Sequence, residues 1–170
     1  MTLRLILMRH AKSSWNTPAQ DDHDRPLNDR GRRSASAIGG WLHGKGYEPD
    51  LVLSSDSART RETWALASRE LSGPTEIVWT QDLYLASAQT MLEVLKTQGT
   101  AKTVLLLGHN PGIAGFANML VRQPPRHDRF RDYPTAATAV IEIDAALWRD
   151  VDWGKGQVTD FILPRELGIS

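Results

Sequence analysis

The sequence of 170 residues contains no cysteine. This absence excludes disulfide bonds, thiolate metal sites and every mechanism that uses a cysteine nucleophile, including that of the cysteine-dependent phosphatases. An excess of charge of either sign is also missing, because 20 Lys and Arg residues balance 20 Asp and Glu residues. The chain as a whole therefore has no electrostatic field that would favour nucleic acid or an anionic membrane as a partner.

Long hydrophobic runs are missing as well. The apolar run from Leu3 to Met8 is short, and Arg9, His10 and Lys12 follow it with no small-residue cleavage site, which argues against a signal peptide. No run approaches the roughly 20 apolar residues that a membrane-spanning helix needs. We therefore expect a soluble, cytoplasmic protein that has neither nucleic acid nor a membrane as its partner.

The composition that is present is typical of a globular protein, with 41% hydrophobic and 24% charged residues. A chain of 170 residues suits one domain. We expect that domain to span residues 1–170.

Predicted strands and helices alternate over the first 120 residues of the chain. The run Leu5 to Met8 does not alternate with polar residues, which is typical of a strand buried on both faces. Asn28 and Gly46 are a candidate N-cap and a candidate left-handed C-cap of one helix. The alternation predicts an α/β fold, a three-layer α/β/α sandwich with a mostly parallel central sheet. We expect strands at 5–8, 51–53, 77–79, 104–107, 139–143 and 158–163, and helices from the Asn28 cap to 45, at 58–71, after Ser87 and at 113–121.

The ends of three predicted strands carry residues that are suited to bind an anion. Arg9 and His10 follow the first strand, Arg59 follows the second closely, and His109 follows the strand at 104–107. Ligands of such sheets bind beyond the carboxyl ends of the strands, so we expect these four side chains to meet there. Arginine can hold phosphate oxygens in bidentate fashion, and imidazole is a competent nucleophile toward phosphorus. The pattern therefore indicates a site for phosphoryl transfer, in which the cations stabilise the developing charge.

Each of these segments also has a simpler interpretation. A single Arg9-His10 pair is typical of a surface, and Gly108 to Gly112 is typical of a turn. Arg59 in the first turn of a helix is normally solvated, although its charge opposes the helix dipole there. The convergence of three segments is what favours the functional interpretation.

Several segments together resemble a known family. Arg9-His10 followed by Ser13, Trp15 and Asn16, just after an N-terminal strand, is similar to the signature of the histidine phosphatase superfamily, whose fold is phosphoglycerate-mutase-like. The resemblance covers residues 3–120 and is strongest to the small SixA-type phosphohistidine phosphatases. The other segments that carry it are Ala11-Lys12 (the superfamily's usual glycine is Ala11 here), Asp24-Arg25-Pro26-Leu27, Asn28 to Gly31, Ser54-Ser55 with Arg59 and Glu62-Thr63, Leu83-Tyr84, and Gly108-His109-Asn110-Pro111.

The resemblance implies a role for each matching site residue. His10 would be the nucleophile that becomes phosphohistidine, and Arg9 and Arg59 would bind the phosphoryl oxygens. His109 would complete the pocket by donating to the phosphoryl group and stabilising its charge. Asn16 lies where larger members have a phosphate-contacting asparagine, so it is also a candidate phosphate-binding residue.

One departure from the family pattern concerns the proton donor. Larger members carry a glutamate after the third strand, whereas this chain has Asp82 and no clear glutamate in the matching stretch. Asp82 is expected to be an exposed loop residue, and Asp22 and Asp24 in the long loop are other candidates. Lack of a strong acid suits a substrate with a good leaving group. Phosphohistidine is such a substrate, because its P–N bond is labile and its imidazole leaves readily.

These observations leave more than one function open. The leading hypothesis is a metal-independent phosphatase that forms a phosphohistidine intermediate and acts on phosphohistidine proteins or a small labile phosphate. The alternatives are a phosphomonoesterase or mutase of a small metabolite and a phosphate-binding regulatory module without turnover. We expect no cofactor and no metal, and we interpret Asp22-His23-Asp24 as loop because no strand precedes it. The sequence predicts neither the substrate protein nor the oligomeric state.

Two basic clusters have no role in these hypotheses. One lies at a helix start and the other in the irregular loop at 124–134. We expect both to be solvated, and the second could also touch an acidic partner. Their members are Arg30, Arg32 and Arg33, and Arg126, His127, Arg129 and Arg131.

Overall fold

The computed structural model describes residues 1–73 and 75–169. A six-stranded sheet forms its centre, with the strand order β3-β2-β4-β1-β5-β6. The strands are β1 (Thr2–Arg9), β2 (Leu51–Ser55), β3 (Glu76–Thr80), β4 (Thr103–Gly108), β5 (Thr138–Asp144) and β6 (Gly156–Ile162). The α-helices are α1 (Asp29–Lys45), α2 (Ala58–Ser68), α3 (Ala88–Gln98) and α4 (Gly112–Leu120), and the short 3-10 helices are η1 (Asp22–Asp24), η2 (Gln81–Leu83), η3 (Trp148–Asp150) and η4 (Pro164–Leu167).

The sheet is mostly parallel, as the alternation of elements predicts. β4 pairs in parallel with β1 and β2, and β2 pairs in parallel with β3. The late strands differ, because β5 runs antiparallel to both β1 and β6. In this register Arg9 lies beside Gly108, and Ser54 lies beside Leu107. The carboxyl ends of β1, β2 and β4 therefore meet at one edge of the sheet.

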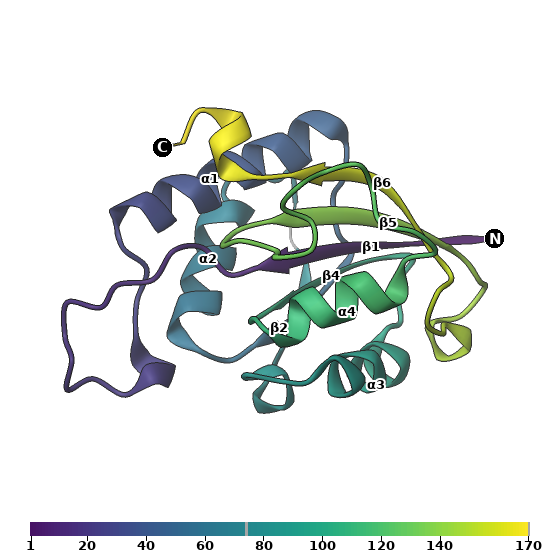
Figure 1. Ribbon diagram of the computed structural model, residues 1–170, viewed down its shortest axis with the longest axis horizontal. Helices are drawn as coiled ribbons and strands as arrows, with labels where there is room; N and C mark the ends of the chain where they lie inside the picture. The colour runs from purple at the N-terminus through teal and green to yellow at the C-terminus, as the bar shows by residue number, and fades with distance from the viewer. Residues whose placement is uncertain (74, 170) are drawn as a thin grey trace.

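Helices cover both faces of the sheet, which confirms the three-layer arrangement (Figure 1). Successive residues of β1 point to opposite faces, since side chains alternate along a strand. Leu5 and Leu7 pack in the core beneath α3 and α4, while Ile6 and Met8 pack in the core beneath α1 and α2. Because helices cover both faces of β1, the side chains on both faces must be apolar, and the run does not alternate with polar residues.

The ends of α1 follow the capping signals in the sequence. Its N-cap Asn28 accepts a hydrogen bond from the backbone N–H of Gly31 at 2.8 Å. Gly46 ends the helix in the left-handed conformation, with φ of 76°. These two signals therefore located the helix correctly.

The end of α2 corrects the sequence prediction. The helix stops at Ser68 rather than at Leu71. The chain continues as a turn in which the N–H groups of Glu70 and Leu71 each donate to a carbonyl three residues earlier. Leu71 still packs against the core, so its apolar character reflects burial in a turn rather than a further helical turn.

The segment between β5 and β6 closes the opposite edge of the sheet. Trp148 of η3 is buried, and its indole N–H donates to the carbonyl of Ala101 at 2.6 Å. After β6 the chain ends in the turn η4, which lies over α1 (Figure 1). No helix within residues 1–73 and 75–169 is long and apolar enough to cross a membrane.

Candidate active site

A pocket of about 310 Å³ lies at the carboxyl ends of β1, β2 and β4. Four of the predicted site residues meet there: Arg9, His10, Arg59 and His109. The fifth, Asn16, is exposed in the long loop between β1 and η1 and does not line the pocket. The full lining consists of Arg9, His10, Lys12, Ser13, Trp15, Asp22, Arg25, Arg59, Leu85, His109, Asn110 and Thr135.

His10 is held in one tautomer by its hydrogen bond. Its Nδ1 lies 2.7 Å from the carbonyl oxygen of Ala11. A carbonyl oxygen can only accept, so Nδ1 carries the proton and Nε2 keeps a free lone pair. Burial lowers the pKa of His10 to about 3, and the neighbouring arginine charges lower it as well. The imidazole is therefore neutral at pH 7, and Nε2 can act as a nucleophile.

The backbone around His10 is fixed by α2. The N–H of Ala11 donates to the hydroxyl of Thr63 at 3.0 Å, and that hydroxyl donates to the carbonyl of Arg59 at 2.7 Å. Ala11 and Thr63 are fully buried. The segment that carries the imidazole is thus tied to the helix that carries Arg59.

His109 is buried next to His10, and the two ring centroids lie 5.2 Å apart. Its Nε2 lies 2.8 Å from the hydroxyl oxygen of Ser55, at the end of the neighbouring strand β2. Its Nδ1 is buried and has no hydrogen-bond partner among the described residues. Burial lowers the pKa of His109 to about 2, assisted by His10 and Arg59. His109 therefore lines the pocket with a neutral ring, one nitrogen atom of which is unpartnered among the described residues.

Arg9 and Arg59 supply the positive charge of the pocket. Arg9 donates through Nη1 to the carbonyl of Tyr133 at 3.2 Å. Arg59 is only 2% exposed, so the simpler interpretation of a solvated helix residue is wrong for it. Its Nη1 and Nη2 donate to the carbonyl and to Oδ2 of Asp22 at 2.7 and 3.0 Å.

Unpartnered polar atoms gather at this pocket. Five buried side-chain nitrogen atoms in the described part of the chain lack a hydrogen-bond partner. Three of them belong to Arg9, Arg59 and His109. Buried polar groups in folded proteins are nearly always paired, and an exception calls for an explanation such as a ligand. The guanidinium groups of Arg9 and Arg59 are cationic, so their unused nitrogen atoms suit an anion such as a phosphoryl group.

Arg25 is a third arginine of the pocket, which the sequence analysis did not assign to the site. It is 8% exposed and donates from Nη1 to the hydroxyl of Ser13 at 2.7 Å. Its guanidinium carbon lies 3.6 Å from the ring centroid of the exposed Trp15. The signal was its place in the Asp24-Arg25-Pro26-Leu27 segment, which carries the resemblance but for which no role was assigned.

Asp22 is the one candidate proton donor that reaches the pocket. Its carboxylate accepts hydrogen bonds from Arg59, Arg25 and the hydroxyl of Tyr84. Partial burial favours a higher pKa, but these hydrogen bonds and the charge of Arg59 outweigh it and hold the pKa of Asp22 well below its usual range. An ionised carboxylate has no proton to give to a leaving group at pH 7.

The other candidate donors lie outside the pocket. Asp24 is exposed, and its carboxylate lies 3.6 Å from Nδ1 of His23. Asp82 is exposed in η2, where its backbone N–H bonds the hydroxyl of Thr80. No glutamate lines the pocket within the described ranges. The site therefore contains no evident general acid.

The Asp22-His23-Asp24 segment forms the short 3-10 helix η1 within the long loop. His23 pairs with the carboxylate of Asp56 at 2.9 Å. No group of three or more His, Asp or Glu side chains in residues 1–73 and 75–169 is arranged to hold a metal ion. The local geometry of this segment is that of an ion-paired turn.

Comparisons with known proteins place this α/β fold and its cation-lined pocket in a family of phosphatases. The family model of the histidine phosphatase superfamily (branch 1) matches residues 5–84. An uncharacterized protein of Mycobacterium tuberculosis is 34% identical over 164 residues, which cover 93% of this chain and 100% of the relative. The chain belongs to the histidine phosphatase superfamily.

Two solved structures are similar over almost the whole chain. The proposed phosphohistidine phosphatase SixA of Agrobacterium tumefaciens has a TM-score of 0.78 and 30% identity, and the match covers 95% of this chain and 98% of that one. The proposed phosphohistidine phosphatase SixA of Nakamurella multipartitia has a TM-score of 0.79 and 31% identity, with 96% and 97% covered. Both have the same sandwich fold, which confirms the predicted fold class.

Proposed function

We propose that this protein is a metal-independent phosphatase that removes phosphate from phosphohistidine in proteins, by way of a phosphohistidine intermediate on His10. The observation that carries the proposal is the tautomer of His10. Its Nδ1 is committed to the carbonyl of Ala11, while Nε2 is free beside the cations Arg9 and Arg59. A neutral nucleophile and fixed positive charge are the two requirements of phosphoryl transfer through an enzyme histidine.

In the first step, the lone pair of His10 Nε2 forms a bond to phosphorus, and the P–N bond of the substrate breaks. The arginines and His109 stabilise the charge on the equatorial phosphoryl oxygens as the transition state forms. In the second step, water attacks phosphorus and the bond to His10 Nε2 breaks. Phosphate leaves with the oxygen of that water, whose proton passes to phosphate or solvent, and His10 returns to its neutral form with Nδ1 still protonated.

The absence of a general acid supports phosphohistidine as the substrate. The second ring nitrogen of a phosphohistidine can itself carry a proton, so the ring leaves as neutral imidazole without help from the enzyme. The alcohol of an alkyl phosphate would leave as an alkoxide and would need a proton donor. Asp22, the carboxyl group at the pocket, is held as its anion by Arg59, Arg25 and Tyr84. The two structures of about 30% identity, both proposed phosphohistidine phosphatases, favour the same substrate.

A phosphomonoesterase of a small metabolite is the competing function. The observation in its favour is that Asp22 reaches the pocket, since a bound phosphate could displace its contact with Arg59 and restore its proton. The two functions differ in the role of Asp22. A phosphomonoesterase would need its proton to release an alcohol, whereas a phosphohistidine phosphatase would not.

The test is to compare kcat/KM for a phosphohistidine peptide, an aryl phosphate and phosphoserine, all in excess chelator. We expect turnover of the first two, and about 10²–10⁴-fold slower turnover of phosphoserine because no acid protonates its alkoxide. The variant Asp22→Asn should hydrolyse the phosphohistidine peptide nearly as fast as the unaltered protein. If phosphoserine is hydrolysed as fast as the phosphohistidine peptide, and Asp22→Asn selectively abolishes the activity on phosphoserine, the phosphomonoesterase is favoured. Inactivation by chelator that a divalent ion reverses would contradict metal independence, and absence of any turnover would favour the regulatory module.

A further inference from the structure

A second cavity of about 440 Å³ adjoins the catalytic pocket, and Arg9, Lys12 and Thr135 line both. Five cationic side chains line this second cavity, whereas Asp132 is its only acidic one. We call it the basic groove. Its cations are Arg9, Lys12, Arg30, Arg129 and Arg165.

Four separate segments bring these cations together. The start of α1 packs directly on the backbone of Lys12, where a Cβ on Gly31 would lie 2.0 Å from the Lys12 carbonyl oxygen. The backbone of Arg30 is therefore held beside that of Lys12. On the other side, His127 pairs with Glu166 of η4 at 3.2 Å, which brings the loop of Arg129 to the turn of Arg165. The two basic clusters of the sequence analysis thus contribute Arg30 and Arg129 to one surface.

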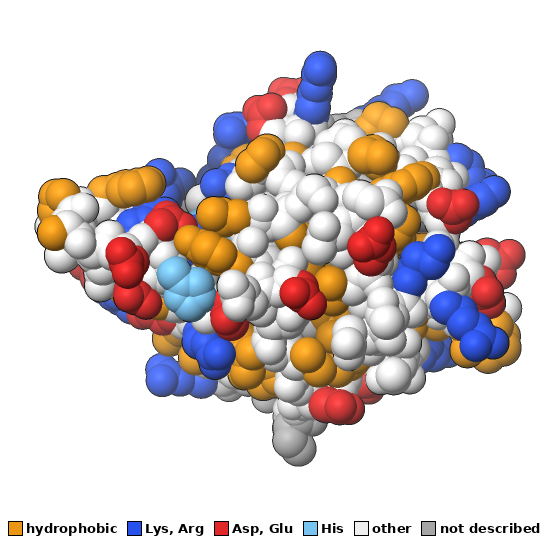
Figure 2. Space-filling view, turned by 90° about the horizontal axis from the view of Figure 1, so that it is seen from below, with side chains coloured by type: hydrophobic (Ala, Val, Ile, Leu, Met, Phe, Trp, Pro, Cys, Tyr) orange, Lys and Arg blue, Asp and Glu red, His pale blue; other side chains and the backbone are white. Residues whose placement is uncertain are grey.

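The charge of the basic groove is largely uncompensated. Asp132 pairs with Arg129 at 3.4 Å. Lys12, Arg30 and Arg165 form no ion pair within the described part of the chain. The chain has no net charge, so this concentration of cations is local. The face over α3, by comparison, carries both basic and acidic side chains (Figure 2).

The position of the basic groove defines what it can bind. The groove continues from the catalytic pocket. The part of a substrate that lies in the groove is therefore the part next to its phosphoryl group. Lys12, Arg30 and Arg165 are exposed at its surface. Exposed, flexible cations recognise acidic side chains on another protein's surface through complementary charge, which raises the rate of association.

We infer that the basic groove is a docking surface for acidic side chains that flank the phosphohistidine of the substrate protein. The inference rests on the proposed function and extends it from the phosphoryl group to the surrounding substrate. It also gives a reason why five cations line one cavity of a chain that has no net charge. A metabolite with a second anionic group is the alternative occupant, and the experiment distinguishes the two.

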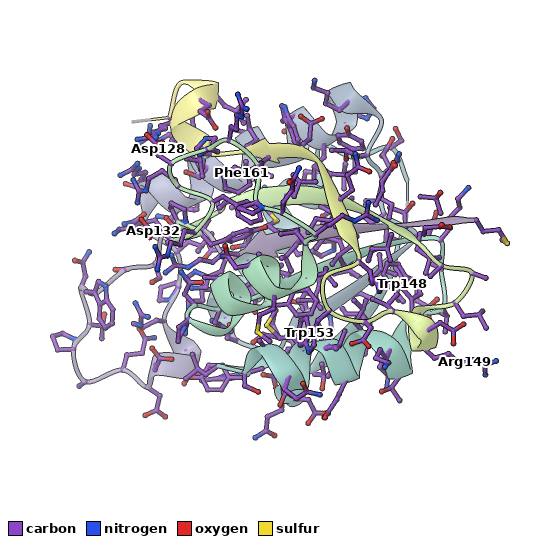
Figure 3. All side chains as sticks on the ribbon, turned by 45° about the vertical axis from the view of Figure 1, so that its right-hand side comes forward. Asp128, Asp132, Trp148, Arg149, Trp153 and Phe161 are labelled. Carbon is purple, nitrogen blue, oxygen red and sulfur yellow. The ribbon has the colours of Figure 1, made fainter. Side chains whose placement is uncertain are left out.

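The test uses two phosphohistidine peptides of equal length. One carries Glu residues on both sides of the phosphohistidine, and the other carries Gln at the same positions. The variant is Arg30→Gln/Arg165→Gln, since neither residue lines the catalytic pocket. The matched control is Arg69→Gln/Arg149→Gln, which changes the net charge equally at exposed positions. Arg149 lies at the opposite end of the molecule from Asp132 of the basic groove (Figure 3).

The unaltered protein and the control should hydrolyse the Glu peptide with a kcat/KM about threefold to tenfold above that of the Gln peptide, as expected for a few exposed ion pairs. The groove variant should lose this preference, mainly through KM. Added salt should weaken the preference in the unaltered protein, because the screening length is about 8 Å at physiological ionic strength. Turnover of an aryl phosphate reports that the catalytic pocket of each variant is intact.

Two results would overturn the inference. One is equal use of both peptides by the unaltered protein, or a preference that survives in the groove variant. The other is a groove variant that is impaired on phosphorylated metabolites with a second anionic group and not on the Glu peptide, which would assign the groove to a small molecule. If the unaltered protein hydrolyses the aryl phosphate but neither peptide, the proposed function itself fails and the inference fails with it.

Discussion

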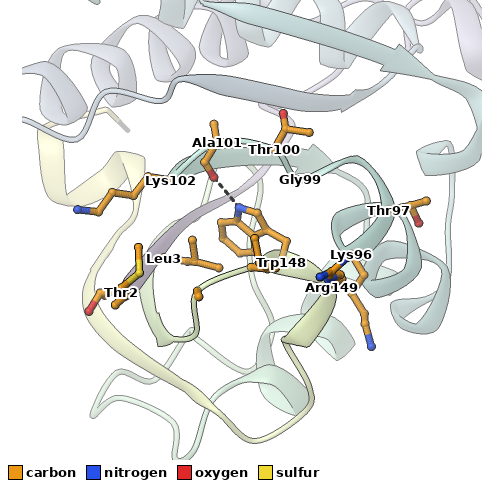
Figure 4. Close-up of a pocket in the computed structure, with 13 residues that line it drawn as sticks. Thr2, Leu3, Lys96, Thr97, Gly99, Thr100, Ala101, Lys102, Trp148 and Arg149 are labelled. Carbon is orange, nitrogen blue, oxygen red and sulfur yellow. Dashed lines mark hydrogen bonds between the residues drawn. The ribbon is translucent and has the colours of Figure 1, made fainter.

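The cavities at the two ends of the central sheet differ in whether their buried polar atoms have hydrogen-bond partners. The cavity at the amino ends of β1 and β4 is the larger, about 490 Å³, against about 310 Å³ for the pocket at the carboxyl ends. Its buried indole, that of Trp148, is satisfied by the carbonyl of Ala101 (Figure 4). At the carboxyl ends, nitrogen atoms of Arg9, Arg59 and His109 are buried without a hydrogen-bond partner in the described ranges.

This difference shows which physical property marks a candidate catalytic site. A large cavity whose polar groups are satisfied needs nothing further to be stable. A small pocket with unpartnered nitrogen atoms on its arginines and two histidines of lowered pKa is arranged for a ligand rather than for stability.

The largest effect is expected for His10→Ala. Removal of the proposed nucleophile should lower kcat by at least about 10³-fold on every substrate, because the proposed covalent intermediate forms on this side chain. Steady-state assays with an aryl phosphate and a phosphohistidine peptide measure this, and circular dichroism verifies the fold. A variant that retains substantial turnover would show that the carboxyl-end pocket works without His10.

Loss of an arginine should have the next largest effect. Arg59→Ala and Arg9→Ala should each reduce kcat by about 10²–10³-fold, as is typical when one preorganised donor to the transition state is removed. Arg59→Lys should rescue poorly, since an ammonium group cannot reproduce the bidentate fork of a guanidinium. Near-normal kinetics of Arg59→Lys would mean that the guanidinium does not grip the phosphoryl group.

The two ends should also differ in their response to acid. The pKa of His10 is about 3 in the folded protein against 6.5 for an ordinary histidine, so below pH 6.5 the unfolded chain binds a proton that the folded protein does not. The free energy of unfolding should fall as pH falls from about 6.5 to about 3, by up to about 1.4 kcal/mol per pH unit from this residue. Urea denaturation across this range should show a shallower loss in His10→Asn than in the unaltered protein. Parallel curves would contradict the lowered pKa.

The smallest effect on activity is expected at the amino end. Trp148→Phe removes the indole donor to the carbonyl of Ala101, a partly buried hydrogen bond, which should reduce stability by about 0.5–1.5 kcal/mol. Its kcat/KM should equal that of the unaltered protein, because the change lies at the other end of the sheet. Chemical denaturation and a steady-state assay provide the two measurements. A loss of kcat/KM without a loss of stability would assign this cavity a functional role.

Much of the site could be predicted because it depends on topology. Strand–helix alternation implies parallel strands, and parallel strands bring their carboxyl ends to one edge, so Arg9, His10, Arg59 and His109 had to meet. The sequence did not reveal that Ser55 contacts His109, or that Arg25 joins the pocket. Both contacts depend on the packing of side chains between distant segments. No local periodicity encodes such contacts.

The long loop limited the prediction most. Asn16 and Asp22 belong to the same polar stretch, yet the structure leaves Asn16 exposed and draws Asp22 to Arg59. The decisive contacts of Asp22 come from α2 and from Tyr84 after η2, neither of which is near it in sequence. The antiparallel direction of β5 was equally unpredicted, since a buried strand has the same pattern in either direction.

The most direct test of the account is to trap the phosphorylated enzyme. Brief incubation with ³²P-labelled substrate, followed by rapid denaturation and peptide mapping, locates the label. We expect phosphate on His10, labile to acid and stable to base, and no label in His10→Ala. Label that resists acid, or that lies on another residue, would contradict the assignment of His10 Nε2 as the nucleophile.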